Sequence, residues 1–439
     1  MSGAAAAVPR PGSLDDGFGD GGRLSGQIGC VPLSVAGVER AEAGAGFRVV
    51  GNTERTSPDL TVEGGRLMVR GYTRRGRLDR DVGRAGTVLV PLPGGRAKAR
   101  GVTRQRDGKL VVVGSVGDDF PDPKQDLFVA RLYPDGSLDA AFGSGGVVTT
   151  DLGGLSEAGR DVVVQPDGRL VVAASVRYQP SAAPGDPATD LVVLRYRPDG
   201  TLDPGFASGG TLRVQASSGE YFVPEGVALT RGGTILVGGN TGLSFRDANS
   251  VSVARVRSDG SLDTTVRFSG VDWTELSAMS FDAKRGRVYL AGSMPRGESN
   301  AQNVMYVAAV RESDLSIDAG FGARGVARAD FPHTSYDFAT SVSSDRRGRV
   351  VLAGGAAVLA RPLRSRFAIA RFTSAGERDR SFARRGLAQV RFPYRQSAAQ
   401  AVLEHPPGRL VVAGIGTGAS PVVRPSTGCV LAVARLAGR

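Results

Sequence analysis

Three carboxylates could take part in acid and base chemistry, and each lies in or next to a connection between two apolar runs. They are Glu225, Glu275 and Asp337. A pair of carboxylates about 5 to 10 Å apart can cleave a glycosidic bond, one as acid and the other as base or nucleophile. A pair such as Glu225 with Glu275 or Asp337 would make the chain a polysaccharide lyase or hydrolase. We keep this as an alternative function.

Aromatic rings cluster in the same connections. Aromatic faces flanked by arginine and carboxylate groups suit a sugar or a peptide. The other interpretation is that the rings fill gaps between packed sheets. On the first interpretation we predict a ligand-binding face with these residues: Trp273, His333, Tyr336, Tyr394, Arg395 and Glu225.

Sequence signatures of catalysis and metal binding are scarce. The two histidines, His333 and His405, have no zinc-like spacing with cysteine. Phosphate-binding loops and nucleophile elbows do not occur. The segment 118–122, Asp-Asp-Phe-Pro-Asp, could hold Ca²⁺ weakly, but a solvated acidic loop explains it as well. We expect no catalytic residue, no metal site and no cofactor.

A short tag punctuates the chain seven times, and it indicates what positions these side chains. Its clearest form is Pro-Asp-Gly-Ser-Leu-Asp-Ala-Ala-Phe-Gly at residues 134–143. The aspartate of the tag falls at Asp15, Asp79, Asp139, Asp203, Asp263, Asp318 and Asp379. A period near 60 residues indicates one supersecondary unit repeated in tandem, each burying its apolar face against its neighbours.

Each repeat contains four short strand-like runs in a meander. In residues 161–214, two β-branched runs flank Pro-Asp-Gly, and a third run, a second Pro-Asp-Gly and the tag lead into a fourth. The continuous apolar runs suit sheets that are buried on both faces. We predict an all-β, seven-bladed β-propeller of four-stranded antiparallel blades. A three-sided β-solenoid is the rival, although solenoid coils usually repeat at half this period or less.

The tag aspartate and a repeated third-strand arginine have structural explanations. An aspartate in this turn can accept backbone N–H bonds. We expect one structural bond per blade from the arginines, and not a ring of binding residues. These arginines are Arg131, Arg195, Arg255, Arg371 and Arg435. The first repeat lacks the arginine and much of the tag.

The two ends of the chain complement each other. The chain starts with a tag that no strand precedes, and it ends where a tag should follow. We expect a flexible segment over residues 1–11 and one β-propeller domain over residues 12–439, in which the opening strand completes the last blade and removes open edges. We also predict a disulfide between Cys30 and Cys429, which would indicate an oxidising compartment; two unrelated buried thiols are the alternative.

The connections differ between the two ends of the repeat. Turns between strands one and two, and between three and four, are short and alike. The connections from strand two to three differ in every repeat, and they emerge on the same face as those from strand four to one. Function is usually placed on varied loops of a rigid scaffold, so we expect it on this face.

Charge and composition set further limits. The net charge is +12, which would attract polyanions such as nucleic acid or acidic wall polymers. Because the arginines are spread over all repeats, we expect no specific nucleic-acid binding. No apolar stretch approaches the ~20 residues of a membrane span. Residues 4–9, Ala-Ala-Ala-Ala-Val-Pro, suit the tail of a removed signal or a floppy natural terminus.

The repeats resemble a known family. The pattern Gln-Pro-Asp-Gly-Arg-Leu-Val-Val-Ala at residues 165–173 is followed by Val-Leu-Arg-Tyr-Arg-Pro-Asp-Gly-Thr-Leu-Asp at 193–203. It resembles the delta-60 repeat family over nearly the whole chain, most specifically in residues 100–150, 160–210 and 340–390. The resemblance implies a bacterial β-propeller, often exported or surface-attached, with no established activity. It therefore brings no catalytic residues.

The sequence favours a non-catalytic binding or scaffold module. We expect an exported, extracellular or cell-surface monomer whose loop-rich face meets a glycan, an anionic cell-wall polymer or a protein; a cytoplasmic location is the alternative. A purely structural repeat that makes surface contacts is a third interpretation.

Overall fold

The protein is an assembly of short antiparallel strands. A computed structural model describes residues 10–26, 31–41, 46–56, 62–117, 124–178, 188–215, 220–242, 250–268, 275–297, 302–359, 363–418 and 430–438. Within these ranges the chain contains strands and turns and no helix. The strands are β1 (Arg23–Gly26), β2 (Val31–Arg40), β3 (Gly46–Thr56), β4 (Val62–Thr73), β5 (Thr87–Val90), β6 (Ala97–Arg104), β7 (Leu110–Gly117), β8 (Gln125–Leu132), β9 (Val147–Thr150), β10 (Ser156–Val164), β11 (Leu170–Tyr178), β12 (Ala188–Tyr196), β13 (Thr211–Val214), β14 (Tyr221–Leu229), β15 (Ile235–Gly242), β16 (Ser250–Val256), β17 (Leu262–Phe268), β18 (Glu275–Asp282), β19 (Arg287–Pro295), β20 (Asn303–Arg311), β21 (Val326–Ala329), β22 (Tyr336–Ser344), β23 (Val350–Val358), β24 (Arg364–Phe372), β25 (Leu387–Val390), β26 (Gln396–Glu404), β27 (Arg409–Thr417) and β28 (Val430–Ala437).

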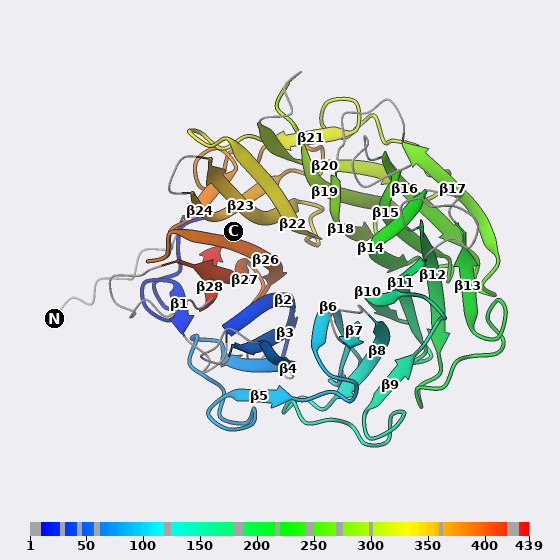
Figure 1. The fold of residues 1–439 in the computed structure, drawn as a ribbon. Coiled ribbons are helices and arrows are strands. Elements are labelled where there is room, and N and C mark those ends of the chain that lie inside the picture. The colour runs from blue at the N-terminus through cyan, green and yellow to red at the C-terminus, as the bar shows by residue number, and fades with distance from the viewer. Residues whose placement is uncertain are drawn as a thin grey trace.

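Antiparallel pairing joins the strands in consecutive groups of four, which we call units. The units run from β2–β5 to β22–β25, and β26, β27 and β28 pair in order with β1 at the outer edge. Figure 1 shows the units arranged radially, with the first strand of each unit innermost. The repeat period of the sequence is therefore the period of the units.

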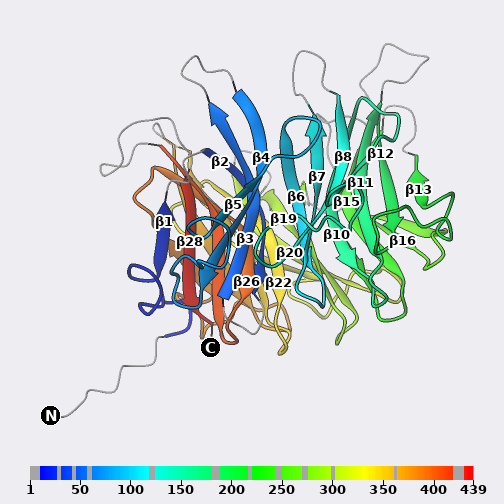
Figure 2. The same ribbon diagram turned by 90° about the horizontal axis from the view of Figure 1, so that it is seen from below.

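The opening strand lies against the last one. Arg23 of β1 is paired with Ala434 of β28, and Leu14 forms an isolated bridge with Leu436. In Figure 2, β1 and β28 lie side by side at the outer edge of the molecule. The sequence predicted this pairing, because the chain starts with the tag and last strand of a repeat and ends after the third strand of another.

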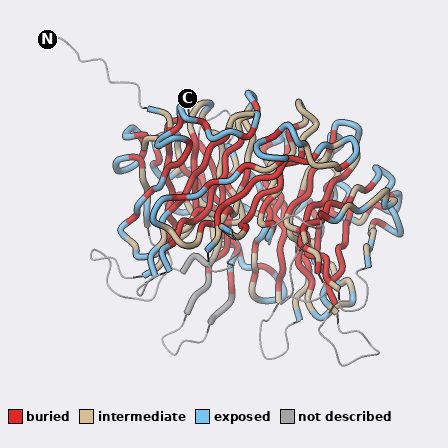
Figure 3. Tube along the Cα trace, turned by 90° about the horizontal axis from the view of Figure 1, so that it is seen from above, coloured by how far each residue is buried: buried red, intermediate tan, exposed pale blue. Residues whose placement is uncertain are grey.

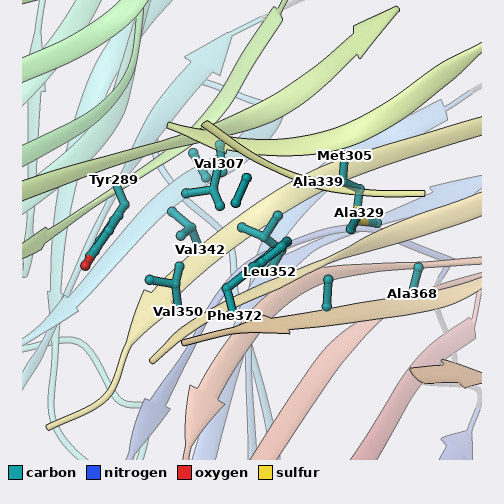
Figure 4. Packing of buried hydrophobic residues seen from close by; sticks show 14 of the residues in the cluster. Tyr289, Met305, Val307, Ala329, Ala339, Val342, Val350, Leu352, Ala368 and Phe372 are labelled. Carbon is teal, nitrogen blue, oxygen red and sulfur yellow. The ribbon is translucent and has the colours of Figure 1, made fainter. Parts of the chain in front are cut away.

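The middle strands of each unit carry the core. All nine residues of β12 are buried, as are the first seven of β11, whereas the outer strand β13 is partly exposed. Figure 3 shows this burial along the strands. Each cluster of apolar side chains spans two neighbouring units; Figure 4 shows Tyr289 and Val307 packed with Val342 and Leu352. The continuous apolar runs are explained by burial on both faces of the sheet.

Each tag aspartate forms an ion pair with an arginine of its own unit. In the β6–β9 unit, Arg131 Nε lies 2.7 Å from Asp139 Oδ2, and the guanidinium stacks 4.6 Å from the Phe142 ring. The corresponding pairs are Arg435–Asp15, Arg48–Asp79, Arg195–Asp203, Arg255–Asp263, Arg287–Asp318 and Arg371–Asp379. The structural interpretation of both repeated residues is thereby confirmed.

The same arginines also reach forward to the following unit. Arg195 Nη1 donates to Ser258 O at 2.6 Å, and Arg287 Nη1 donates to Ser374 O at 2.7 Å. Arg371 and Arg435 donate in the same way to Gly438 O and Arg74 O. Each guanidinium thus ties its own tag to the turn before the next tag. A planar fork with several donors suits such a double role.

Two units lack the third-strand arginine, and in both of them an arginine of the second strand pairs with the tag aspartate. Gly71 takes its place in β4, and Arg48, directly opposite on β3, lies 2.9 Å from Asp79. Ala309 takes its place in β20, and Arg287 at the start of β19 lies 2.6 Å from Asp318. The guanidinium site is therefore filled in the first unit, where the sequence indicated that the arginine was lost.

The second oxygen of the tag aspartate holds the turn. Asp139 Oδ1 accepts the Ala141 N–H at 3.2 Å, and Asp379 Oδ1 accepts the Ser381 N–H at 3.0 Å. These are the backbone bonds that the sequence predicted for this turn.

Candidate ligand-binding site

Every innermost strand contains at least one β-bulge. The register with the second strand shifts by one residue at Ala36, Arg100, Arg160, Glu225, Ser277, Thr340 and Gln400. A bulge leaves one residue unpaired and re-aims its side chain. Three of these bulge residues are charged, Arg100, Arg160 and Glu225, and they lie on innermost strands.

Three bulge residues line one pocket of about 420 Å³: Arg100, Arg160 and Glu225. Most of the remaining lining is polar and comes from the neighbouring strands: Gln125, Ser156, Ala158, Ser175, Arg177, Thr189, Tyr221, Val223, Asn240 and Glu275. Gln125, Ser156, Tyr221 and Glu275 begin their strands. The pocket, which we call the axial pocket, therefore opens on the face that the sequence predicted to be loop-rich.

Burial and charge tune the groups in the axial pocket. Burial raises the pKa of Glu225 to about 7, Arg160 and Arg100 oppose that rise, and Glu275 adds to it. Arg160 Nη1 lies 3.9 Å from Glu225 Oε1, and its Nε donates to Ser175 Oγ at 3.2 Å. Burial also lowers the pKa of Arg160. Near neutral pH, Glu225 can therefore accept or donate a hydrogen bond to a ligand.

A buried amide fixes the far wall of the axial pocket. Asn240 Nδ2 donates to Leu276 O at 2.8 Å, and Asn240 Oδ1 accepts the Leu276 N–H at 2.8 Å. This pair of bonds ties β15 to the start of β18, where Glu275 lies. Ser293 Oγ donates to Glu275 Oε2 at 3.4 Å. Glu275 is held beside the pocket by its own strand and by β19.

The structure separates the residues that the sequence grouped into one site. Glu225 and Glu275 line the axial pocket. His333 lines a different pocket of about 680 Å³ with Arg364 and Arg384. Asp337 lies under the β21–β22 connection, where it accepts the Phe331 N–H at 2.9 Å. The predicted face therefore holds more than one hollow, and Glu225 lines the more polar of these two pockets.

Two other predicted residues, Tyr336 and Tyr394, have packing roles. The Tyr336 ring packs against the Phe338 ring at 5.8 Å. Tyr394 packs on a core cluster and covers Gly416, where a Cβ would lie 2.4 Å from Tyr394 Cδ2. Arg395 is exposed, and its carbonyl accepts the Ser365 N–H at 3.1 Å.

The buried aromatics of these connections fill space between units. Phe222, Phe331 and Phe392 are 5%, 1% and 3% exposed and belong to core clusters. For these rings the gap-filling interpretation is correct. Trp273, both cysteines of the predicted disulfide, the acidic segment 118–122 and residues 1–9 lie outside the described residues.

Sequence reasoning missed the arginines of the axial pocket. Arg100 and Arg160 stand at bulges inside strands, and their types alone did not distinguish them from the many other arginines. The available signal was position: Arg100 and Arg160 each stand two residues before a valine at the start of a repeat, Val102 and Val162 respectively. Only the register of β6 and β10 shows that both are bulge residues.

Comparisons with known proteins support the fold. A family model described as "Domain of unknown function (DUF5122) beta-propeller" matches residues 105–142, 165–206 and 233–265. No curated protein matches the sequence. With the radial units, the family match identifies a β-propeller fold that is all-β over the described residues.

Three solved structures are similar to the chain. A protein of unknown function from Dyadobacter fermentans has a TM-score of 0.47 and 10% identity, with 98% of each chain covered. The α-L-arabinofuranosidase Arb93A from Fusarium graminearum, in complex with an iminosugar inhibitor, has a TM-score of 0.44 and 11% identity, covering 76% of this chain and 92% of its own. Sqt1 from Chaetomium thermophilum has a TM-score of 0.42 and 10% identity, covering 92% and 96%.

The described residues include no helix with the length and apolar character needed to cross a membrane.

Proposed function

We propose that the protein is a non-catalytic binding β-propeller that takes a glycan or cell-wall polymer in its axial pocket. The observation that carries this proposal is the lining of that pocket. Guanidinium, amide, hydroxyl and carboxylate groups converge there from several units. Such a lining can satisfy the many hydroxyl groups of a sugar, whereas an apolar ligand would leave it unpaired.

The charges in the pocket favour binding over cleavage. Arg160 lies 3.9 Å from Glu225, and outside the pocket Arg296 lies 3.8 Å from Asp337. A carboxylate that is paired with arginine is held in place and is less available as a free base or nucleophile. Arg100, Arg160 and Arg177 also give the pocket positive groups for an acidic sugar.

The number of blades, the closure of the ring and the location of the protein are part of the same proposal. We take the seven units to be the blades of a closed propeller of the delta-60 type, one domain over residues 12–439, that acts as an exported monomer at the cell surface. The β1–β28 pairing and the forward bonds of the arginines support a closed ring. The resemblance of the repeats to the delta-60 family, whose members are often exported or surface-attached, supports export.

Binding should be tested with the full chain on a glycan array and on isolated cell-wall polymer. Arg177 is exposed and lines the pocket; Arg177→Ala should weaken binding about ten-fold, because a charge-assisted hydrogen bond is lost. Arg106→Ala, in an exposed turn between β6 and β7, is the matched control and should bind like the wild type. Equal binding by wild type and Arg177→Ala would contradict the site. Binding to a protein, with no binding to any glycan or cell-wall polymer, would contradict the proposed class of ligand.

One observation keeps an enzyme as the second candidate. Glu225 has a pKa raised to about 7 and shares its pocket with Glu275. A carboxylic acid of that pKa beside a second carboxylate could act as a general acid on a glycosidic bond. Release of reducing ends by wild type, lost in Glu225→Gln, would establish this candidate and exclude the non-catalytic one.

A further inference from the structure

Three carboxylates meet at the junction of the β6–β9 and β10–β13 units. Asp126 is the second residue of β8, Asp151 follows β9 directly, and Glu157 is the second residue of β10. One carboxylate oxygen from each lies within 4.8 Å of the other two. Asp126 is half-buried and Asp151 is exposed, while Glu157 is only 1% exposed. Three formal negative charges thus converge on one small volume.

Two oxygens of this cluster are buried without a partner. Glu157 Oε1 accepts the Gly154 N–H at 2.6 Å. Among the described residues, nothing forms a hydrogen bond with Glu157 Oε2 or with Asp126 Oδ1. Burying a carboxylate oxygen unpaired is costly, so such atoms normally have a donor or a cation. In the described part of the chain, one ion pair reaches the cluster: Lys124 Nζ, on a side chain that is 71% exposed, lies 4.0 Å from Asp151 Oδ2.

Another junction of the same molecule shows how such carboxylates are otherwise neutralised. Asp337 occupies the position of Glu157, as the second residue of β22, and Asp330 occupies the position of Asp151, directly after β21. There Arg296 Nη2 lies 2.5 Å from Asp330 Oδ1 and 3.8 Å from Asp337 Oδ2. The counterpart of Arg296 in the β6–β9 unit is an aspartate, Asp118, which lies outside the described residues.

The position of Asp126 gives a second internal comparison. Its counterpart in the β10–β13 unit is Asp190, and Arg213 Nε lies 2.6 Å from Asp190 Oδ2. Arg213 is paired in register with Val192, just as Thr149 is paired with Phe128 at the carboxylate cluster. The β10–β13 unit therefore supplies a guanidinium at this position, Arg213, whereas the β6–β9 unit has a threonine, Thr149.

We propose that Asp126, Asp151 and Glu157 bind a divalent cation, and that the cation is Ca²⁺. Carboxylate oxygens are hard ligands, and Ca²⁺ accepts six to eight oxygens in a flexible arrangement that includes waters. The cation takes the role that Arg296 has at the junction of the β18–β21 and β22–β25 units. This site departs from the expectation that the chain holds no metal. Its ligands are spread over 32 residues and three elements, so no local spacing indicated it.

The site also adjoins the axial pocket. Gln125 and Ser156, which line that pocket, are the chain neighbours of Asp126 and Glu157, and Ser156 Oγ lies 3.4 Å from Gln125 Oε1. A cation would therefore hold this wall of the pocket. The inference itself does not depend on what the pocket binds.

The test measures Ca²⁺ binding and thermal unfolding of the full chain after removal of metal with a chelator. Calorimetric titration with CaCl₂ should show one site, and the unfolding temperature should rise with Ca²⁺ concentration because the cation binds the folded state. Asp151→Asn changes an exposed ligand and should weaken Ca²⁺ binding about ten-fold or more, since affinity follows ligand charge. Asp259→Asn, in an exposed turn, is the matched control and should respond like the wild type.

A second variant guards against loss of folding. Thr149→Arg places a guanidinium where Arg213 stands in the next unit, so it should satisfy Asp126 internally. It should unfold at the same temperature with and without Ca²⁺, and at a higher temperature than metal-free wild type. No Ca²⁺ binding by wild type at 1 to 5 mM, about the weak end of protein Ca²⁺ sites, would overturn the proposal. An unchanged Ca²⁺ response in both Asp151→Asn and Thr149→Arg would overturn it as well.

Discussion

Arg371 and Asp379 form a buried ion pair that also joins two units. Arg371 Nε lies 2.8 Å from Asp379 Oδ2, and its Nη1 donates to Gly438 O at the end of the chain. Arg371 is 1% exposed and its guanidinium stacks 4.4 Å from the Phe382 ring. The pair therefore links the β22–β25 unit to the unit that contains both β1 and β28.

Removing this arginine should destabilise the whole fold. Arg371→Met keeps the length of the stem but leaves Asp379 buried without its partner, which costs about 3 to 5 kcal/mol of unfolding free energy. Chemical denaturation measures the change. Arg378→Met, on an exposed neighbour, is the control and should change stability by less than about 0.5 kcal/mol. A loss below about 1 kcal/mol in Arg371→Met would show that the pair is not important for stability.

In the first unit we expect the effects of substitutions at residues 48 and 71 on the free energy of unfolding to be coupled. Arg48→Val should leave Asp79 unpaired and cost about 3 kcal/mol. Gly71→Arg should restore at least about 1 kcal/mol in that background, because it returns the guanidinium to the usual strand. In the wild type the same change should only destabilise, since a Cβ at Gly71 would already lie 3.2 Å from Arg48 Nη1.

A double-mutant cycle from denaturation curves measures this coupling. The contact of a new side chain with Val82, 2.5 Å from a Cβ at Gly71, is common to both backgrounds and largely cancels. Additive effects of the two substitutions would mean that the guanidinium site is not interchangeable between the strands.

Asp139 should make the protein sensitive to acid in a defined window. Burial alone would raise the pKa of Asp139, but the Lys109 ammonium and the Tyr133 hydroxyl, with further donors, hold it at about 2. Because the folded pKa lies below the unfolded value of 3.8, the stabilisation is present above about pH 4 and is lost as the pH falls toward 2. Lys109→Met removes the ammonium 3.0 Å from Asp139 and should move the acid-unfolding midpoint upward.

Circular dichroism along an acid titration measures that midpoint. Lys284→Met removes an exposed lysine with the same change in net charge and should leave the midpoint nearly in place. Coincident acid transitions for the wild type and Lys109→Met would contradict the role of Lys109.

For Glu225 we expect the free energy of unfolding to depend on pH in the opposite direction. Its folded pKa, about 7, lies above the ordinary value of 4.5, so its contribution to stability is fully present below about pH 4.5 and is lost as the pH rises through 7. Glu225→Gln keeps the shape and does not titrate. Between pH 5 and 8 the wild type should lose about 1 to 2 kcal/mol relative to this variant, after allowance for a side chain that is 25% exposed.

Urea denaturation at a series of pH values gives both curves. Glu377→Gln, in an exposed turn, is the control and should follow the wild type at every pH. Parallel curves for the wild type and Glu225→Gln would show that Glu225 titrates normally.

The sequence by itself determined the period, the strands and the structural nature of the tag. Alternating turns and apolar runs depend on local backbone preferences and burial, which a repeat displays several times over. It therefore indicated that Asp139 and Arg131 were structural residues. It also indicated that the opening strand pairs with the last.

The tertiary structure decided which side chains share a site. One-residue bulges at Arg160 and Glu225 bring the groups of the axial pocket together, and a shift of one residue is invisible in an apolar pattern. The Tyr394 ring packs against Gly416, which has no side chain to keep the ring away. The carboxylates of Asp126, Asp151 and Glu157 meet because neighbouring units bring separate strand ends together, and sequence spacing carries no record of that proximity.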